Sequence, residues 1–487
     1  MPEQPDYDVV VIGTGISGYC AALEALTAGA RVLMVDAAER IGGSSWLSTG
    51  ILMGANTRFQ RERGVTDDTH ERLYQLYMAA NQWLVQPSVA KRLCYEAGPT
   101  IDWLEQKGVE YLDLTRAGGE DRPRGHITAG GESIVTALAG KVQQFDRADL
   151  ALKTRVDRLL LSDGRVRGIC AGNDTVSASA VIMATGGMGA DPDLLAQWHR
   201  DAFVDISGPP RYVGPASARG DAVRLAQQVD AQVVSGRGSR SPIWSFGGGY
   251  LPGWIVVVNA LGRRFLDETS AYGIAELAFA AQPGACGFAV FDDATKRSMR
   301  TYDDVVRHLK VLLPGTESLQ RSYLSPNVDD LVSAGKIVKA DTVPALAARL
   351  GIPADNLLGT LERYNEFVSH GSDDDYLKQP HSLRAVTEGP FYGFDIHLPM
   401  FGLTGAGVRI DHNACVMHRS GRALPGLFAS GECTGGVLGT IYVGSGNALA
   451  NASTYGRVAG RSAAAFALTG AVPPIDWAAL GVEQHLQ

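Results

Sequence analysis

Residues 8–18 read DVVVIGTGISG, and this stretch decides how the chain begins to fold. An apolar run typical of a buried strand leads into a glycine-rich turn, and the residues after the turn have the composition of a helix. Glycines at 13, 15 and 18 permit a tight turn and a close approach to a ligand, while the helix directs its free N–H groups at the same point. The stretch predicts a site for the pyrophosphate of a dinucleotide.

An acidic residue ends the next strand-like segment, Arg31–Val35. Asp36 has the spacing of the carboxylate that accepts both ribose hydroxyls of an adenosine in dinucleotide-binding folds. The same negative charge disfavours a 2′-phosphate. Because strand, glycine turn, helix, second strand and acidic residue follow in the required order, we predict a dinucleotide site rather than an ordinary glycine turn.

Size and composition indicate a globular protein of two domains. The chain has 487 residues, more than one ordinary core accommodates, with 45% hydrophobic and 20% charged residues. Its formal net charge is −8, and no basic run is interleaved with aromatic residues. We therefore expect neither a nucleic acid nor an anionic membrane surface as a partner.

The cysteines and the N-terminus bear on the compartment. Six cysteines, at positions 20, 94, 170, 286, 415 and 433, are widely spaced and form no CxxC pair. This favours reduced thiols over a disulfide framework, a zinc site or an iron–sulfur cluster. The acidic N-terminus leads into the first strand without a basic segment, and no apolar stretch is long enough to cross a bilayer. We expect a cytoplasmic protein without stable membrane insertion.

The whole chain predicts an α/β protein in which one domain interrupts another. Residues 1–236 and 388–487 are rich in glycine and strand-like runs, and we assign them to the two parts of a nucleotide-binding domain. Residues 237–387 begin with aromatic residues and continue rich in helix formers, and we assign them to an inserted α+β domain. Three strand-like runs of the first part predict a β-meander that returns to the nucleotide-binding sheet. They are Ala151–Leu161, Val166–Ala171 and Val176–Ala184.

Four separated segments resemble the fumarate reductase and succinate dehydrogenase flavoprotein superfamily, over nearly the whole chain. They are GTGISG at 13–18 with Asp36, GGSS at 42–45, ATGG at 184–187, and SGECTGG at 430–436 followed by GSGNA at 444–448. The resemblance implies FAD as the cofactor, a Rossmann-like FAD-binding domain, and an inserted domain that caps the site and contributes to catalysis. Members with covalent flavin carry a histidine in the early loop, where this chain has GGSSW, so the resemblance implies non-covalent FAD.

The resemblance also assigns cofactor-binding residues. The glycines of the first turn would hold the pyrophosphate, Ser44 and Ser45 the middle of FAD, and Glu432 the ribityl or ribose region. The helix that begins near Asn447 would direct its positive end at the flavin pyrimidine. The full set is Gly13, Gly15, Ser17, Gly18, Asp36, Ala37, Gly43, Ser44, Ser45, Ser48, Gly50, Val156, Thr185, Gly186, Gly187, Asp221, Gly431, Glu432, Asn447, Ala448 and Leu449.

The substrate residues depart from the fumarate reductase pattern. Tyr442 stands where a C-terminal arginine of the reductases would clamp a carboxylate, and Tyr272 stands where their proton-donating arginine would lie. The histidine expected within residues 400–405 is missing, whereas His126 resembles a substrate-binding histidine of the reductases. Two tyrosines in place of arginines resemble the 3-ketosteroid dehydrogenases and related cyclic-ketone dehydrogenases.

The chemistry of that branch assigns roles to these residues. To introduce a C=C bond beside a ketone, a flavin takes a hydride from the β-carbon and a base removes the α-proton. We predict that the Tyr442 hydroxyl and the Gly446 N–H bind the ketone oxygen, that Tyr272 is the base, and that Ser445 and His126 lie at the substrate.

A phenol is a weak base at neutral pH. With a pKa near 10 it costs about 4 kcal/mol to ionise at pH 7, so Tyr272 needs a partner that lowers this value. Tyr111, Tyr212 and His126 are the candidates in the sequence.

Three functions remain open at this point. The first is FAD-dependent desaturation of a cyclic ketone, a 3-oxosteroid or a cyclohexanone, with electrons passing to an external quinone-like or protein acceptor. The second is a fumarate-type ene reductase, or a dehydrogenase of a carboxylated substrate. The third is a flavin-binding protein without turnover. In that case either tyrosine is an ordinary aromatic residue of the fold, and His126 is structural.

Overall fold

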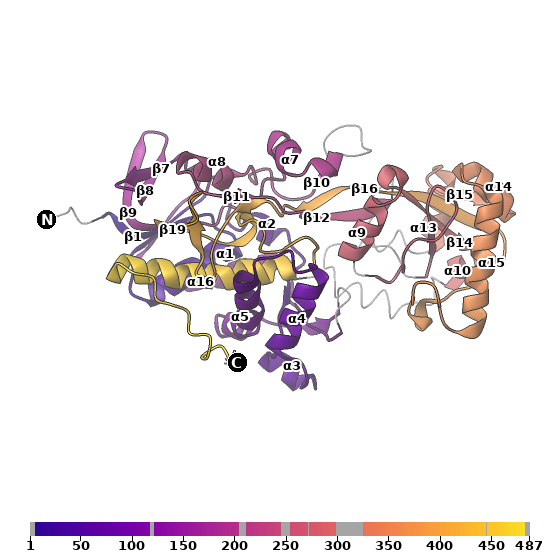
Figure 1. Ribbon diagram of the computed structural model, residues 1–487, viewed down its shortest axis with the longest axis horizontal. Helices are drawn as coiled ribbons and strands as arrows, with labels where there is room; N and C mark the ends of the chain where they lie inside the picture. The colour runs from indigo at the N-terminus through magenta and orange to yellow at the C-terminus, as the bar shows by residue number, and fades with distance from the viewer. Residues whose placement is uncertain are drawn as a thin grey trace. The chain divides into compact units, whose positions relative to one another are not determined.

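The structure is a computed structural model that describes residues 5–116, 121–203, 211–244, 254–270, 272–298, 325–444 and 446–482. The chain divides into two compact units (Figure 1). The first unit comprises residues 1–200, 212–239 and 402–487, and the second comprises residues 201–211 and 240–401. The second unit is therefore inserted in the sequence of the first.

An eight-stranded sheet forms the centre of the first unit. Its continuous order is β18 (Cys415–Met417), β19 (Ala423–Ala429), β9 (Asp174–Met183), β1 (Tyr7–Ile12), β2 (Val32–Val35) and β6 (Ala148–Ala151). The strands from β19 to β6 are parallel, and Val10 of β1 lies opposite Leu33 on one side and Val181 on the other. β1 is central, and its residues Val9–Ile12 are buried, which accounts for their continuously apolar sequence.

Two further strands extend this sheet in antiparallel fashion. β7 (Arg158–Ser162) pairs with β8 (Arg165–Ala171), which pairs with β9. The predicted run Ala151–Leu161 is not one strand, because the chain leaves β6 at Ala151 and re-enters a strand only at Arg158. Lys153 between them has a φ of +56°, which no strand accommodates.

Helices α1 (Ile16–Thr27) and α16 (Asn447–Thr469) pack against each other beside the sheet (Figure 1). Glycines let the two backbones approach closely. A Cβ at Gly460 would lie 2.3 Å from the Ala21 carbonyl oxygen, and one at Gly456 would lie 2.5 Å from the Ser17 carbonyl oxygen. The last long helix of the chain is thereby held against the first.

The other elements of the first unit surround this core. The helices are α2 (Gly43–Trp46), α3 (Arg58–Glu62), α4 (His70–Ala80), α5 (Pro87–Gln106), α6 (Gly131–Val142), α7 (Pro192–Trp198) and α8 (Asp221–Gln228). The strands are β3 (Ile51–Met53), β4 (Asp113–Thr115) and β5 (Gly125–Ile127) in one antiparallel sheet, and the pair β11 (Val233–Val234) and β17 (Gly407–Val408).

A six-stranded sheet forms the core of the second unit. It contains β10 (Arg211–Tyr212), β12 (Ser239–Trp244), β13 (Val256–Val258), β14 (Gly287–Asp292), β15 (Val338–Ala340) and β16 (Phe391–Leu403). The helices are α9 (Tyr272–Ala280), α10 (Asp293–Ser298), α13 (Ser325–Ser333), α14 (Val343–Leu350) and α15 (Ala354–His370). Val257 belongs to a hydrophobic cluster with Phe279 of α9, whereas Val258 belongs to another with Leu346 of α14. Successive residues of β13 thus face opposite sides of the sheet, and helices cover both.

The whole chain therefore has a mixed α/β fold. Its two units meet in sequence at 239/240 and 401/402, whereas our sequence boundaries lie at 236/237 and 387/388, and they also meet at 200/201 and 211/212. β16 accounts for the second difference, because Phe391–Ile396 pair with β14 and β15 of the second unit. A glycine-rich sequence in this segment suggested the nucleotide-binding domain, but pairing partners decide where it folds.

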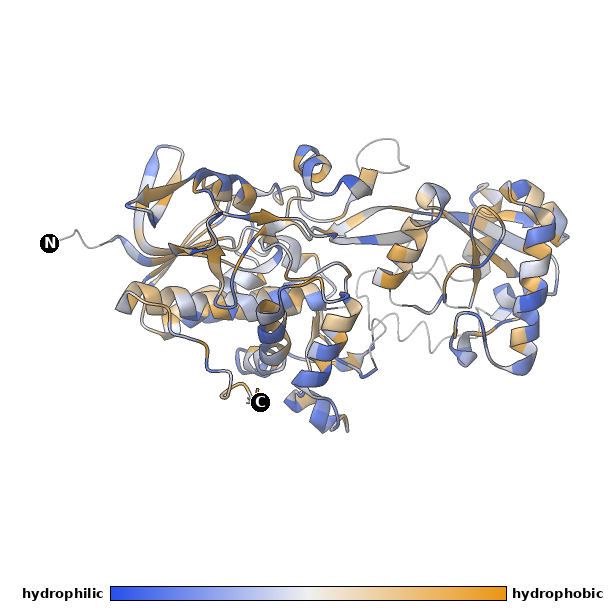
Figure 2. Ribbon diagram, in the orientation of Figure 1, coloured by the Kyte–Doolittle hydropathy of each residue, from blue (hydrophilic) through white to orange (hydrophobic). Residues whose placement is uncertain are grey.

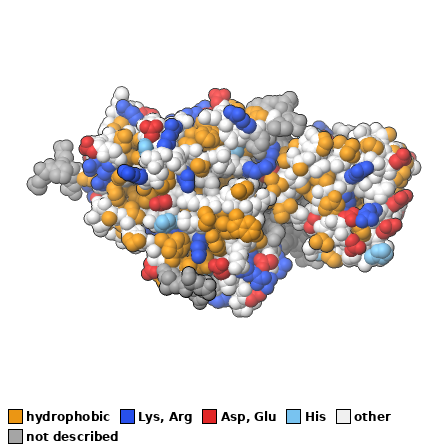
Figure 3. All heavy atoms as spheres, in the orientation of Figure 1, with side chains coloured by type: hydrophobic (Ala, Val, Ile, Leu, Met, Phe, Trp, Pro, Cys, Tyr) orange, Lys and Arg blue, Asp and Glu red, His pale blue; other side chains and the backbone are white. Residues whose placement is uncertain are grey.

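Hydrophobic residues are concentrated on the strands of both units (Figure 2). On the face seen in Figure 3, acidic and basic side chains are interspersed rather than gathered by sign. Within the described ranges, no helix combines the length and the apolar character needed to cross a membrane.

The α1–α16 contact predicts opposite effects of the same substitution at two helical glycines. Gly460→Ala places a methyl group against the Ala21 backbone and should lower the free energy of unfolding by roughly 1–3 kcal/mol. Gly140→Ala in α6 meets no atom within 4 Å and should raise it by about 0.5–1 kcal/mol, because alanine favours helix. Urea unfolding followed by circular dichroism measures both. Equal effects of the two substitutions would contradict the close packing.

Candidate functional site

The glycine turn after β1 is held against the turn after β9. Gly13 has a φ of +116°, and a Cβ there would lie 2.2 Å from the carbonyl oxygen of Ala184. A Cβ at Gly18 would lie 2.0 Å from the carbonyl oxygen of Gly13. Only glycine fits at either position, so the predicted GTGISG and ATGG motifs meet at the carboxyl ends of parallel strands.

The GGSS loop joins the same turn. The Ile16 N–H at the start of α1 donates to Ser45 Oγ at 3.1 Å, and the Gly42 N–H donates to the Thr14 carbonyl at 3.0 Å. Gly15 is the N-cap of α1 and supplies no capping side chain. The first turn of α1 therefore directs its N–H groups and the positive end of its dipole toward a point beside this loop.

Asp36 lies at the end of β2, as expected. Its Oδ2 accepts hydrogen bonds from the Thr14 N–H at 2.8 Å and the Thr14 hydroxyl at 2.6 Å, and its Oδ1 accepts from the Ala38 N–H at 2.9 Å. The Thr154 N–H donates to the Asp36 carbonyl at 2.8 Å, which brings the segment of Val156 alongside. The carboxylate is thus fixed in orientation and retains lone pairs for further donors.

The SGE segment approaches α1 from the other side. Ser17 Oγ lies 2.7 Å from Ser430 Oγ, and a Cβ at Gly187 would lie 2.1 Å from Glu432 Oε1. Glu432 Oε1 also accepts from the Thr404 N–H and hydroxyl, both at 2.9 Å. Loss of hydration raises the pKa of Glu432, and the hydrogen bonds from Thr404 and from the Gly187 backbone oppose this.

The N-terminus of α16 completes the group. Gly446 has a φ of +94° and its carbonyl accepts from the Met53 N–H at 3.2 Å, so the turn is locked against β3. The Tyr442 hydroxyl accepts from the Ala448 N–H at 3.0 Å. Asn447 is fully buried and Leu449 is 8% exposed. Ser445 lies outside the described residues.

The remaining predicted cofactor residues lie on the same loops. Ser48 Oγ donates to the Ser45 carbonyl at 2.8 Å, and the Gly50 carbonyl accepts from the Thr128 hydroxyl at 2.8 Å. Asp221, the first residue of α8, forms an ion pair with Arg155, and burial raises its pKa. Four further predicted residues lie within the loops described above, and the two glycines among them have positive φ. They are Ala37, Gly43, Ser44 and Gly186.

This arrangement fits a dinucleotide. The Thr185 hydroxyl is buried at the ATGG turn, and within the described residues it has no hydrogen-bond partner. A buried unpaired hydroxyl costs free energy unless a bound group satisfies it. Together with the N-terminus of α1 and the fixed carboxylate of Asp36, it provides donors for phosphates and an acceptor for ribose hydroxyls.

His126 is fully buried in β5 and tied to its own unit. Its Nδ1 lies 2.9 Å from the Arg124 carbonyl, which requires a proton on Nδ1, and its Nε2 lies 2.7 Å from Thr57 Oγ1. Loss of hydration lowers the pKa of His126 to about 4. The imidazole is therefore neutral near pH 7, and both nitrogens are engaged.

Tyr111 and Tyr212, the other two candidate partners of Tyr272, also contact neighbouring residues of the chain. The Tyr111 hydroxyl donates to the Ile101 carbonyl at 2.9 Å, and its ring meets that of His126 edge-on at 5.5 Å. Tyr212 packs against Gly189, where a Cβ would lie 2.1 Å from its ring. Loss of hydration raises the pKa of both phenols.

Tyr272 begins α9 in the second unit, and its side chain lies outside the described residues. The segment before it is anchored by a buried ion network. Arg264 contacts Glu268 at 2.9 Å and Asp373 at 2.8 Å, and Lys378 contacts Glu268 at 3.2 Å. Glu268 also accepts from the Val257 N–H at 3.0 Å, so residues 264–268 are tied to β13.

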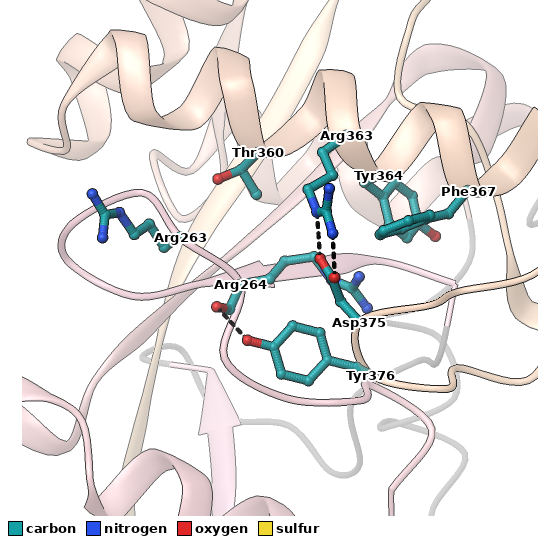
Figure 4. Close-up of a pocket in the computed structure, with 8 residues that line it drawn as sticks. All are labelled: Arg263, Arg264, Thr360, Arg363, Tyr364, Phe367, Asp375 and Tyr376. Atoms are coloured by element: carbon teal, nitrogen blue, oxygen red, sulfur yellow. Dashed lines mark hydrogen bonds and ion pairs between the residues drawn. The ribbon is translucent and has the colours of Figure 1, made fainter.

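A pocket of about 150 Å³ lies over this network (Figure 4). Arg363 and Asp375 face each other in a two-bond ion pair, and the Tyr376 hydroxyl donates to the Arg264 carbonyl at 2.9 Å (Figure 4). Two of the three arginines that line it, Arg264 and Arg363, are paired with carboxylates. The pocket therefore offers little uncompensated charge to an anionic ligand.

Comparison with known proteins identifies the family. The family model described as FAD binding domain matches residues 8–449. A fumarate reductase (cytochrome) from Shewanella frigidimarina is 30% identical over 483 residues, covering 94% of this chain and 77% of that protein. A vinyl phenol reductase from Lactiplantibacillus plantarum is 30% identical over 504 residues, covering 96% of this chain and 98% of that protein.

A solved structure is similar over the same length. It is a 3-ketosteroid Δ4-(5α)-dehydrogenase from Rhodococcus jostii RHA1 in complex with 4-androstene-3,17-dione, with a TM-score of 0.78 and 25% identity, covering 95% of this chain and 98% of that one. The chain belongs to the FAD binding domain family, within the fumarate reductase and succinate dehydrogenase flavoprotein superfamily. It is an FAD-dependent oxidoreductase, which confirms the predicted cofactor and enzyme class.

Two residues that the sequence did not single out hold the site together. Thr14 orients Asp36, and Thr404 orients Glu432. Thr14 is a variable position of the glycine motif, and Thr404 lies in a segment that we considered only for a missing histidine. Thr14 lies between two glycines and Thr404 precedes Gly405, which was a signal of close backbone approach, but nothing in the sequence indicated the carboxylate that each threonine meets.

The buried neutral His126 predicts a loss of stability in acid. Its pKa is about 4 in the folded state and about 6.5 when unfolded, so the unfolded chain binds more protons between these values. The neutral imidazole therefore contributes on the order of 3 kcal/mol to the free energy of unfolding. This contribution is complete above about pH 6.5 and is lost as the pH falls toward about 4.

Urea unfolding at about pH 7 and about pH 5 measures this contribution. The wild-type protein should lose more stability on acidification than His126→Gln does. His381→Gln, at an exposed histidine, is the matched control and should behave like wild type. Equal losses in His126→Gln and wild type would show that the imidazole is not the titrating group.

Proposed function

We propose that the enzyme desaturates a cyclic ketone, removing a hydride from the β-carbon and a proton from the α-carbon. The observation that carries the proposal is the position of Tyr442. Its hydroxyl accepts from the N–H of Ala448 in the first turn of α16, the helix of which Gly446 is the N-cap. A hydroxyl donor and a helix N-terminus thus lie together at the predicted substrate end of the cofactor site.

This pair suits an oxygen that is neutral in the substrate and becomes negative in the transition state. A phenol is a neutral hydrogen-bonding group, and the helix dipole favours negative charge at its N-terminus. We assign the Tyr442 hydroxyl and the Gly446 N–H to the ketone oxygen. Each such donor contributes roughly 3–4 kcal/mol to transition-state stabilisation. A carboxylate would instead need a guanidinium, which the sequence lacks at this position.

Tyr272 is the proposed base for the α-proton. FAD, when bound, supplies the acceptor for the hydride from the β-carbon. The proton leaves to the phenolate oxygen of Tyr272, and the developing enolate is held by Tyr442 and Gly446. Tyr111, Tyr212 and His126 take no part in this proposal, because burial opposes charge on each of them. Ser445 remains a proposed substrate contact.

The proposal for FAD follows the loops described above. Gly13, Gly15, Ser17 and Gly18 approach the pyrophosphate, and Asp36 with Ala37 and Val156 surround the adenosine. The other proposed cofactor residues are Gly43, Ser44, Ser45, Ser48, Gly50, Thr185, Gly186, Gly187, Asp221, Gly431, Glu432, Asn447, Ala448 and Leu449. Because the loop at 42–46 has no histidine, we propose that FAD is held without a covalent bond.

The two units take different parts in this proposal. The first acts as a Rossmann-like FAD-binding domain, supported by its parallel strands and the glycine turn at their carboxyl ends. The second acts as a capping domain that supplies Tyr272. Electrons leave to an external quinone-like or protein acceptor. The six cysteines are free, which supports a reducing, cytoplasmic compartment.

A fumarate-type reductase is the second candidate. Its support is the 30% identity to a fumarate reductase and to a vinyl phenol reductase, both of which are named as reductases. The ketone proposal is supported by the 25% identical ketosteroid dehydrogenase and by hydroxyl groups in place of the arginines. The two candidates differ in the direction of electron flow and in the charge of the substrate.

Anaerobic mixing separates these candidates. The oxidised holoenzyme, mixed with a 3-oxosteroid or with cyclohexanone, should lose its flavin absorbance, because substrate hydride reduces FAD. Dithionite-reduced enzyme mixed with fumarate should stay reduced. Reoxidation by fumarate, with no bleaching by either ketone, would favour the reductase and contradict the proposal. Unchanged spectra in both directions would support a binding protein without turnover.

Replacing the proposed donor should slow the chemical step. Tyr442→Phe should lower kcat for a bleaching ketone by about a hundredfold, because one transition-state hydrogen bond is lost. The FAD content should remain that of wild type, since the ring is retained. Tyr74→Phe, at a half-buried tyrosine of α4, is the matched control and should leave kcat unchanged. A change in KM alone would show that Tyr442 binds substrate without stabilising the enolate.

A further inference from the structure

Three polar side chains in the second unit share one face of a two-stranded ladder. β14 and β16 are antiparallel, with Gly287 opposite Ile396 and Phe288 opposite Asp395. Cys286, immediately before β14, therefore falls opposite His397. Asp395 and His397 are two residues apart on β16 and point to the same face. The cluster follows from strand register, independently of any single rotamer.

The contacts within this cluster are specific. Cys286 Sγ lies 4.0 Å from His397 Nε2, which lies 2.7 Å from Asp395 Oδ2. The thiol also donates to the Gly287 carbonyl at 3.6 Å. The side chains of His397 and Asp395 are 38% and 37% exposed. Hydrogen bonding to Asp395, followed by that to Cys286, raises the pKa of His397 to about 10, so the ring is a cation near pH 7.

Cys286 differs from the other cysteines of the chain. It is partly exposed, whereas Cys20, Cys94, Cys170, Cys415 and Cys433 are buried. Loss of hydration raises the pKa of Cys433 to about 12, and it raises those of Cys20, Cys94 and Cys415 as well. Buried thiols of this kind are inert, whereas an accessible thiol beside a cation reacts as the thiolate.

The geometry points to Cys286 as a modification site that forms a mixed disulfide with a small-molecule disulfide. The Cys286 thiolate attacks one sulfur of the disulfide, a new S–S bond forms, and the original S–S bond breaks. Cys286 is oxidised, and the departing half leaves as a thiolate and is thereby reduced. The imidazolium of His397 favours the attacking thiolate by its charge.

The cluster is not arranged for hydrolysis or for metal binding. Asp395 and Cys286 both face Nε2 of His397, so the carboxylate does not hold the opposite ring nitrogen as in a nucleophile–base–acid triad. A protonated imidazole has no lone pair with which to act as a base or a ligand. Among the residues that the structure describes, no group of three or more histidine, cysteine, aspartate or glutamate side chains is placed to hold a metal.

Among the residues that the structure describes, the groups that raise the pKa of His397 are Asp395 and Cys286. On the face of Asp395 and His397, Leu350 of α14 packs against Gly393, where a Cβ would lie 2.7 Å from its side chain, whereas Phe279 of α9 packs on the opposite face, where its ring would lie 2.8 Å from a Cβ at Gly287. Glu276 of the same helix is buried against Arg240. The 3₁₀ turn Pro283–Ala285 before Cys286 carries no titratable side chain. His397 and Asp395 are therefore the groups whose removal should change the reactivity.

Incubation of the holoenzyme with glutathione disulfide, followed by peptide mass mapping, tests the site. One glutathionyl group should appear on Cys286 and none on the five buried cysteines, and dithiothreitol should remove it. His397→Gln should slow the modification by about fivefold or more at pH 7, because the cation is lost. His381→Gln, an exposed histidine of the same unit, is the control and should react at the wild-type rate.

Asp395→Asn provides a second test, which measures how the rate of Cys286 modification depends on pH and does not require the catalytic activity of the enzyme. Without the carboxylate, His397 should lose its proton nearer to pH 6.5, as a free histidine does. Modification should then be slower than wild type at about pH 8.5 and similar to wild type at about pH 6. Preferential labelling of another cysteine, no labelling of Cys286, or equal rates in wild type and His397→Gln would overturn the proposal.

Discussion

The close approach of two backbone turns at Gly13 is the constraint on which the first unit depends. A Cβ there would lie 2.2 Å from the Ala184 carbonyl oxygen, so the ends of β1 and β9 can meet only through glycine. This contact places the start of α1 and the ATGG turn at one edge of the parallel sheet, where such sheets bind ligands. A side chain at position 13 would therefore push the GTGISG and ATGG motifs apart, whether or not a nucleotide is bound.

The chemistry that we propose depends on the side chain that lies at the N-terminus of α16, which is Tyr442. α16 runs alongside α1, because Gly456 and Gly460 allow the two helices to touch, and the first turn of α16 holds the Tyr442 hydroxyl. A guanidinium at that position would carry a full charge and would suit a carboxylate. A phenol on a helix dipole carries none, and it stabilises charge only as charge develops on the substrate oxygen. In the proposed function, a tyrosine at this position therefore suits a ketone oxygen, whereas an arginine would suit a carboxylate.

Local sequence was sufficient wherever a short segment determines its own conformation. The strand–turn–helix of residues 8–18 could be predicted because glycine spacing and apolar runs act over a few residues, and Asp36 followed from its place at a strand end. The strand pairing of Phe391–Ile396 could not, because it depends on partners about a hundred residues away in β14. The break near Lys153 was hidden for a different reason, since apolar residues stand on both sides of it, Leu152 and Val156, and the sequence does not show its positive φ.

Long-range polar contacts could not be predicted either, because they join residues that are far apart in the sequence. Thr14 and Thr404 each meet a carboxylate through both backbone and hydroxyl, and His126 resembles a substrate ligand in sequence although both its nitrogens are engaged within the unit. A motif specifies the type of residue at a position, but the donors and acceptors around it come from the folded chain. The pair of Cys286 and His397 shows this most clearly: 111 positions separate them, and only the register of β14 and β16 makes them neighbours. Reactivity that arises from such a pair is a property of sheet pairing, so it is found by following strand register rather than by searching for cysteine motifs.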